Sequence, residues 1–185
     1  MSRIQTQGLH HITLNGADRQ TAIDFWEGLL GMPLVFEQPN LDAEHINHLY
    51  FDPGDGRLLT VFTEESRERG GEVVNQVGSV HHIAFTVSFS TYTRVFERLK
   101  ARGIANSGPV DRGFMHTGYF RDPCGQMIEL SAWKFEPPQG STHAEVLRLA
   151  HDFRVIRGAK TIEDADIADA IEAITSRRGL SLNAD

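Results

Sequence analysis

The sequence predicts an α+β fold built from two tandem copies of one module, followed by a helical C-terminal extension. Residues 8–14 (GLHHITL) return as residues 79–85 (SVHHIAF), so His11 and His82 stand at equivalent positions 71 residues apart. A helical pattern follows each copy of this segment, and a pair of strand patterns ends each half. Self-similarity at a fixed offset, with the same order of elements in both halves, indicates a duplicated unit.

Each repeated segment leads into an amphipathic helix. Apolar side chains recur there with helical spacing and form one stripe per helix. The stripes consist of Ala22, Phe25, Trp26, Leu29 and Leu30 in the first half and of Tyr92, Val95, Phe96 and Leu99 in the second. Gly31 and Gly103 follow the stripes, where the C-terminus of a helix favours a left-handed residue.

The two halves also end alike. Residues 49–60 (LYFDPGDGRLLT) mirror residues 118–129 (GYFRDPCGQMIE), and both contain an Asp-Pro turn between two strand patterns. Each half is therefore predicted to run strand, helix and then about three strands.

These patterns define the expected domain boundaries. We predict one domain over residues 1–136 and a helical extension over residues 137–185. Within the domain, module one covers residues 8–63, a polar linker covers residues 64–78, and module two covers residues 79–133. Nothing in the extension suggests chemistry, so we expect it to pack on the domain or on a second subunit.

Two helical patterns make up the extension. Thr142 with Glu145 and Thr161 with Asp164 have the spacing of N-terminal capping boxes, although Asp is a weaker partner than Glu. We expect one helix to begin at each of these pairs.

Composition and charge exclude several classes of protein. The chain has 185 residues, of which 40% are hydrophobic, and a formal net charge of −7. No apolar run approaches the roughly 20 residues of a membrane-spanning helix, the first residues show no apolar secretory segment, and the acidic balance argues against nucleic-acid binding. The single cysteine, Cys124, cannot form an internal disulfide or a Cys-rich zinc site. We therefore expect a cytoplasmic protein without nucleic-acid or membrane partners, and a homodimer because exposed sheet edges often pair.

The repeated strands carry residues suited to metal binding. Because side chains alternate in a strand, His11 and Thr13 share one face in the first copy. In the second copy His82 and Ala84 share one face in the same way. Glu129 lies between Ile128 and Leu130 in the last predicted strand, where a carboxylate is costly unless it pairs or binds a cation. Two histidines and one carboxylate from three strands form a facial triad, which suits Fe(II) and also Mn(II).

On these residues the repeat resembles the vicinal oxygen chelate superfamily, over residues 8–133. This superfamily includes glyoxalase I, extradiol ring-cleaving dioxygenases, fosfomycin-resistance thiol transferases and metal-free bleomycin-binding proteins. The resemblance implies two βαβββ modules whose strands form a cup around a metal. It places the metal ligands at His11, His82 and Glu129, and the fourth ligand position at Thr60.

Thr60 is a poor ligand, so the predicted site looks like that of the ring-cleaving dioxygenases. The resemblance then implies an Fe(II)-dependent dioxygenase, with Mn(II) as the alternative metal. Its substrates are a dihydroxylated aromatic compound of the catechol or hydroquinone type and O2. Tyr119, ten residues before Glu129, is the candidate proton donor, and His10, beside the first ligand, is a second catalytic candidate near the pocket.

Three other functions remain open at this point. A fosfomycin-resistance-type thiol transferase also uses two His and one Glu, but it needs basic residues for a phosphonate, and Lys100 and Arg102 fall on a predicted helix surface. A glyoxalase-like lyase needs a fourth protein ligand. A non-catalytic small-molecule-binding protein is expected if the triad holds no metal.

Overall fold

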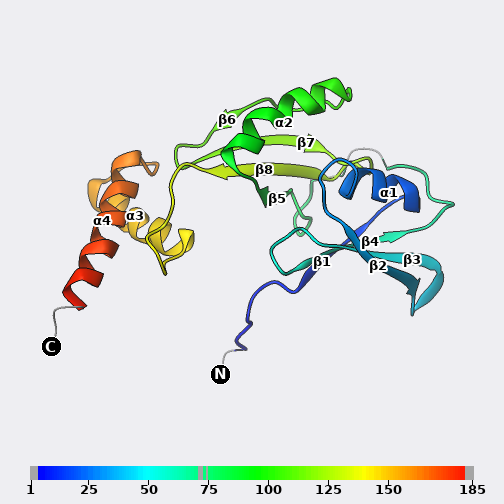
Figure 1. Cartoon of the computed structure of the whole chain (residues 1–185), viewed down its shortest axis with the longest axis horizontal. Helices are drawn as coiled ribbons and strands as arrows, with labels where there is room; N and C mark the ends of the chain where they lie inside the picture. The colour runs from blue at the N-terminus through cyan, green and yellow to red at the C-terminus, as the bar shows by residue number, and fades with distance from the viewer. Residues whose placement is uncertain (1–3, 71–72, 74, 182–185) are drawn as a thin grey trace. The chain divides into compact units, whose positions relative to one another are not determined.

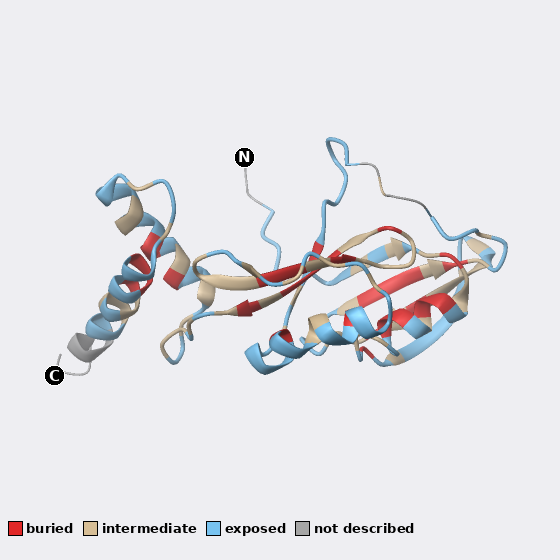
Figure 2. Cartoon of the chain, turned by 90° about the horizontal axis from the view of Figure 1, so that it is seen from above, coloured by how far each residue is buried: buried red, intermediate tan, exposed pale blue. Residues whose placement is uncertain are grey.

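The computed structural model describes residues 4–70, 73 and 75–181 of the chain. Its contacts divide the chain into two compact units, Met1–His81 with Arg121–Met127 and His82–Phe120 with Ile128–Asp185. Each unit contains a four-stranded sheet (Figure 1). Buried residues lie along the strands of both sheets and in the C-terminal helices (Figure 2).

The first unit follows the predicted order of strand, helix and three strands. It contains β1 (His11–Asn15), α1 (Arg19–Trp26), β2 (Leu34–Asn40), β3 (Ala43–Phe51) and β4 (Leu58–Thr63). The sheet order is β1-β4-β3-β2, in which β1 runs parallel to β4 and the other pairs are antiparallel. The first strand of the module therefore pairs with its last strand.

Local sequence explains where α1 begins and ends. The Asp18 carboxylate accepts hydrogen bonds from the amide and hydroxyl groups of Thr21, at 2.8 and 2.7 Å, and these bonds lower the pKa of the carboxyl group. The helix ends at Trp26, so Leu29 and Leu30 lie in the following turn rather than in the helix as predicted. Gly31 has the expected left-handed conformation, with φ of 72°.

One face of the first sheet packs against α1. Leu49, Phe51, Leu59 and Val61 point to this face, and each is at most 2% exposed. Alternation along β3 and β4 therefore directs the intervening side chains, among them His48, Tyr50, Thr60 and Phe62, to the opposite face, where the predicted ligand His11 also lies.

The second unit repeats this topology. It contains β5 (Ile83–Thr86), α2 (Phe89–Ala101), β6 (Val110–Asp111), β7 (Met115–Arg121) and β8 (Met127–Trp133). The sheet order is β5-β8-β7-β6, again with the first strand parallel to the last. The prediction of two βαβββ modules is confirmed.

The strand register confirms the alignment of the two copies. Thr13 lies opposite Thr60 in the first sheet, and Ala84 lies opposite Glu129 in the second. Thr13 and Ala84 each follow a repeated histidine by two residues. Thr60 and Glu129 are therefore equivalent positions, as their spacing in the sequence predicted.

The helical extension consists of α3 (His143–Arg157) and α4 (Asp164–Ser181). Thr142 and Glu145 form the predicted capping box at the start of α3. The second predicted box is wrong, because α4 begins only at Asp164. The side chain that accepts a hydrogen bond from the Glu163 amide is that of Asp166, not that of Thr161. Among the residues that the structure describes, no helix is both long and apolar enough to cross a membrane.

The extension packs on the end of β8 and carries its own core. Val146, Leu149 and Ala150 of α3 meet Ile167 and Ala170 of α4. Phe114 and Phe135 also pack against this core. His143 stacks on Trp133 with ring centroids 4.3 Å apart, so aromatic contacts join the first turn of α3 to the last residue of β8.

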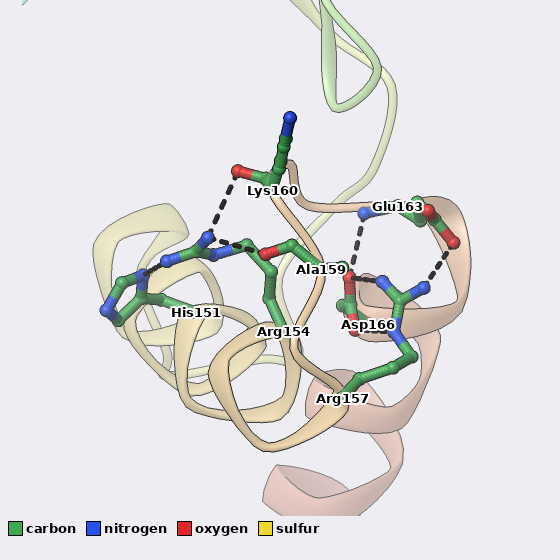
Figure 3. Close-up of polar contacts among 7 residues, drawn as sticks. All are labelled: His151, Arg154, Arg157, Ala159, Lys160, Glu163 and Asp166. Carbon is green, nitrogen blue, oxygen red and sulfur yellow. Dashed lines mark hydrogen bonds and ion pairs between the residues drawn. The ribbon is translucent and has the colours of Figure 1, made fainter.

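A polar network fixes the turn between α3 and α4 (Figure 3). Arg157 pairs with Glu163 and with Asp166, of which Asp166 is buried. Arg154 donates hydrogen bonds to the backbone carbonyl groups of Ala159 and Lys160, at 2.8 and 3.0 Å. These bonds satisfy carbonyl groups that would otherwise be unpaired after the helix end.

Gly118 allows α2 to pack closely on β7, and this gives a stability prediction. A Cβ atom at Gly118 would overlap the ring of Phe96 and approach the Gly108 carbonyl oxygen to 3.2 Å. We expect Gly118→Ala to lower the free energy of unfolding by about 1–3 kcal/mol, because the Phe96 ring must move. Urea denaturation measures this loss. In a Phe96→Leu background the same substitution should cost clearly less, and equal costs in both backgrounds would contradict the steric explanation.

Candidate functional site

Glu129 has specific partners at the face of the second sheet that is turned away from α2. The carboxylate is 3% exposed, and its Oε2 lies 2.9 Å from Nε2 of His82. The hydroxyl of Ser131, two residues further along β8, donates to Oε1 at 2.7 Å. A buried carboxylate thus has a hydrogen-bond partner on each oxygen, which offsets part of the cost of removing it from water.

Tyr119 and Arg112 extend this group along the same unit. The Tyr119 ring packs edge-to-face with the His82 ring, with centroids 5.9 Å apart. Arg112 places a guanidinium nitrogen 3.4 Å from the Tyr119 hydroxyl and its guanidinium carbon 5.8 Å from the ring centroid. The Arg112 side chain is exposed, and no carboxylate of the described residues forms an ion pair with it. A phenol and a positive charge therefore stand beside the His82–Glu129 pair.

In the first unit, His10 and His11 contact each other. Their Nδ1 atoms lie 2.8 Å apart, and the rings meet edge-to-face at 5.1 Å between centroids. One Nδ1 must donate and the other accept. If His11 is the donor, its Nε2 keeps a free lone pair, which is the tautomer that a metal-binding histidine needs.

The segment before β1 is held against β4, which fixes where this pair lies. The Leu58 amide donates to the His10 carbonyl at 3.4 Å, and the Arg57 side chain donates to the Leu9 carbonyl at 3.0 Å. β1 itself begins at His11. Strand alternation therefore does not govern the direction of the His10 side chain, and the two rings can touch.

The face of the first sheet opposite α1 carries a row of four rings, which we call the ring row. Phe36 stacks on Tyr50 at 4.0 Å between centroids, Tyr50 contacts His48 at 4.2 Å, and His48 contacts Phe62 at 4.4 Å. The strand register explains this order, since Phe36 pairs with Tyr50 and His48 pairs with Phe62. The row crosses β2, β3 and β4.

His48 is the imidazole of the ring row. Its Nδ1 lies 2.9 Å from the Tyr50 hydroxyl, whereas its Nε2 is buried and has no hydrogen-bond partner. Burial lowers the pKa of His48 below its ordinary value, and the nearby His11 adds to the shift. His48 is therefore a neutral imidazole with one unsatisfied nitrogen.

Thr60, at the fourth ligand position, already has a partner. Its buried hydroxyl donates to the Thr13 hydroxyl at 2.8 Å. This bond joins β4 to β1 on the face that carries His11 and the ring row. Thr60 thus acts within the sheet, in agreement with its poor qualities as a ligand.

Cys124 does not have the surroundings of a nucleophile. Burial raises the pKa of its thiol, and the neighbouring Asp122 carboxylate raises it further. The thiolate form of Cys124 is therefore disfavoured, and the sequence likewise offered no reason to expect a catalytic role for this residue.

The structure distributes the predicted site residues over both units. It brings His82, Glu129 and Tyr119 together in the second unit, and it brings His10 and His11 together in the first. Within residues 4–70, 73 and 75–181, no group of three or more His, Cys, Asp or Glu side chains is placed to hold a metal ion. The triad of His11, His82 and Glu129 therefore remains a prediction.

Two partners were missed in the sequence. Ser131 follows Glu129 by two residues, and Tyr50 follows His48 by two residues, so each pair shares a strand face. Period-two spacing is the signal that could have identified them. It marks residues that share a face but not those that touch, which is why it did not single them out.

Comparison with known proteins identifies the family. Residues 8–130 match the model of a protein family that is described as the Glyoxalase/Bleomycin resistance protein/Dioxygenase superfamily. The chain belongs to this superfamily. The match covers both sheets and ends in β8, one residue after Glu129, so the C-terminal helices lie outside it.

Relatives in the superfamily include ring-cleaving enzymes. "Biphenyl-2,3-diol 1,2-dioxygenase 3" of Rhodococcus globerulus is 30% identical over 145 residues, covering 74% of this chain and 69% of that protein. "Putative ring-cleaving dioxygenase MhqE" of Bacillus subtilis (strain 168) is 31% identical over 105 residues, which are 55% of this chain and 34% of that protein. The chain thus corresponds to about a third of the length of MhqE.

The comparison also finds a relative that is named as a glutathione transferase. "Glutathione transferase FosA" of Serratia marcescens is 29% identical over 124 residues, covering 67% of this chain and 79% of that protein. Among solved structures, one described as a putative dioxygenase from Bacillus subtilis subsp. subtilis str. 168 has a TM-score of 0.60 and 28% identity, over 69% of this chain and 41% of that chain. The structure comparison and the sequence comparison therefore each include a protein that is described as a dioxygenase.

The lowered pKa of His48 predicts a pH dependence of stability. Below its ordinary pKa of 6.5, the unfolded chain binds a proton that the folded protein takes up only at lower pH, because the folded pKa is lowered. We therefore expect the free energy of unfolding to fall as pH decreases below 6.5, and His48→Gln to make this slope shallower. Urea titrations between pH 7 and about pH 5 measure it. His45→Gln, an exposed change in the same strand, should keep the wild-type slope, and identical slopes in both variants would contradict the assignment to His48.

Proposed function

We propose that this protein is an Fe(II)-dependent ring-cleaving dioxygenase that acts on a dihydroxylated aromatic compound of the catechol or hydroquinone type. The observation that carries the proposal is the contact between His82 and the buried Glu129, beside Tyr119 and Arg112. This proposal is supported because an imidazole and a carboxylate, here 2.9 Å apart, are two of the donor types that a facial triad uses.

The donor types fit the proposed metal. We propose that His82 and Glu129 supply two ligands and His11 supplies the third, with Mn(II) as the alternative to Fe(II). Ser131 supports this assignment because it holds one carboxylate oxygen of Glu129 by a hydrogen bond, as partners of metal ligands commonly do. The contact of His10 with His11 supports it in the same way. When bound, the metal would supply Lewis acidity toward the substrate hydroxyls and a redox centre for O2.

The chain itself contributes binding and proton handling. The Arg112 guanidinium has no acidic partner among the described residues, so it is suited to hold a negatively charged oxygen of the substrate. The Tyr119 hydroxyl, 3.4 Å from this guanidinium, can donate a proton or hydrogen bond to the same oxygen. His10 is the second catalytic candidate, and its contact gives it the role of orienting His11.

Thiol transfer of the fosfomycin-resistance type is the second candidate. It is favoured by the 29% identity to FosA, which extends over 79% of that protein. A phosphonate substrate calls for several convergent cations. Among the described residues of the second unit, Arg112 is the one cation that contacts the Tyr119 hydroxyl, and Lys134 is paired with Asp111. This distribution of charge supports ring cleavage over thiol transfer.

Metal content provides the decisive test of the proposed function. We expect protein reconstituted anaerobically with Fe(II) to bind close to one iron per chain and to consume O2 when catechol or hydroquinone is added. His82→Ala and Glu129→Gln should each lose most of the iron, because each removes a ligand. His45→Ala, which removes an exposed histidine, should retain it. Full iron binding by His82→Ala, or wild-type protein that binds no metal, would contradict the site. Metal binding together with glutathione transfer and no O2 uptake would favour the FosA-like function.

The roles of Tyr119 and Arg112 are separable by kinetics. Tyr119→Phe removes a proton donor, so we expect kcat to fall by about 100-fold with iron content unchanged. Arg112→Ala removes a charge that binds the substrate, so we expect KM to rise by about tenfold with a smaller effect on kcat. Steady-state O2 uptake at several substrate concentrations measures both. Lys100→Ala, on α2, serves as the charge-matched control, and an equal loss in that variant would exclude a specific role for Arg112.

A further inference from the structure

The strongest unexplained feature outside the proposed ligand set is the unsatisfied nitrogen of His48. Buried polar atoms in folded proteins are almost always hydrogen-bonded, and an exception calls for a specific cause. Nε2 of His48 is buried and has no partner, while Nδ1 of the same ring lies 2.9 Å from the Tyr50 hydroxyl. One hydrogen bond, at Nδ1, therefore holds the His48 ring in place, and the hydrogen bond that Nε2 could form is not made.

The partner of Nδ1 determines what the free nitrogen can do. A phenol is a better donor than a neutral imidazole, and an imidazole nitrogen is a good acceptor. Tyr50 therefore donates to Nδ1, and the proton of the neutral ring resides on Nε2. The missing partner of His48 is then an acceptor, such as a hydroxyl, phenolate or carbonyl oxygen.

The neighbours of His48 indicate the rest of the ligand. Phe36, Tyr50 and Phe62 form the ring row with it, at centroid separations of 4.0–4.4 Å. Flat apolar surfaces of this kind stack on a planar ring. Polar groups along the same face are Gln38, which lies opposite His48 on β2, and, across β4 and β1, the Thr13–Thr60 hydroxyl pair and His11. An oxygen acceptor attached to an aromatic ring satisfies both the donor and the ring surfaces.

We propose that His48 is a ligand-binding residue, whose Nε2–H donates to an oxygen substituent of a planar aromatic ligand packed against the ring row. Tyr50 is a positioning residue, because it keeps the Nδ1 atom occupied and the proton on Nε2. In the free protein the neighbouring side chains cover Nε2, so a side chain of the row turns aside as the ligand enters. This inference rests on the proposed function for the identity of the ligand class, and it adds a specificity contact on the first unit.

The first experiment uses catechol as the probe and metal-free protein, so that it does not depend on iron. We expect the 15N resonance of His48 Nε2 to shift when catechol is added, and the resonance of His45 to stay in place. The second experiment measures the Kd of catechol for Fe(II)-loaded protein without O2. His48→Leu should weaken binding by about tenfold with iron content unchanged, His48→Gln should retain part of the affinity because its amide also donates, and His45→Leu should equal wild type.

The outcomes separate this inference from the proposed function. An unchanged Kd in folded, iron-loaded His48→Leu protein, or an unshifted His48 resonance, overturns the binding role. If His48→Leu does not fold, the resonance and the His48→Gln variant decide. A catechol-induced shift of His48 in a protein that takes up no iron supports the binding role while the dioxygenase function fails. O2 uptake that is equal in wild-type, His48→Gln and His48→Leu protein supports the dioxygenase function and overturns the role of His48.

Discussion

The parallel pairing of the first and last strands in each module determines where all the candidate functional groups lie. It places β1 beside β4 and β5 beside β8, although most of a module separates the two strands in sequence. Through this pairing Thr60 reaches Thr13, and Glu129 reaches the strand that follows His82. Antiparallel neighbours could be joined by a tight turn, but parallel strands need a crossover. In both modules that crossover includes a helix, α1 or α2, which leaves the other sheet face for the candidate functional groups and, in the first module, for the ring row.

Much of this architecture could be predicted from the sequence because the chain contains it twice. The repeated His-His segment, the helical stripes and the Asp-Pro turns are local patterns, and two copies with the same spacing reduce the chance of coincidence. The equivalence of Thr60 and Glu129 followed from counting residues and agrees with the strand register. Helix ends were less predictable. Thr161 has the right type and spacing for a cap, but the Arg157–Asp166 pair and the Glu163 amide place the start of α4 later.

Contacts between side chains on neighbouring strands were not predictable in the same way. His48 and Phe62 belong to different strands, and their contact depends on a register that no local pattern specifies. The same holds for Arg112, whose side chain meets Tyr119 from the turn before β7. Sequence spacing identified the predicted ligands His82 and Glu129 as candidates, and only the folded second unit shows that they touch. The assignment of all three triad residues, His11, His82 and Glu129, as metal ligands stays a prediction from the sequence.

The two modules show how one backbone supports different chemistry through a few side chains. At one pair of opposite positions, the first module has two threonines that bond to each other, and the second has Ala84 and Glu129. Alanine offers no hydrogen bond, so the Glu129 carboxylate turns to His82 and Ser131. The tyrosines ten residues earlier diverge as well, since Tyr50 meets His48 whereas Tyr119 meets Arg112 and His82. The two modules keep the same register at this position, but the Thr13 hydroxyl of the first module has no counterpart at Ala84 of the second, where Glu129 is paired with His82 and Ser131 instead. One module therefore has a hydroxyl pair at this position, and the other has a carboxylate held by a histidine and a serine.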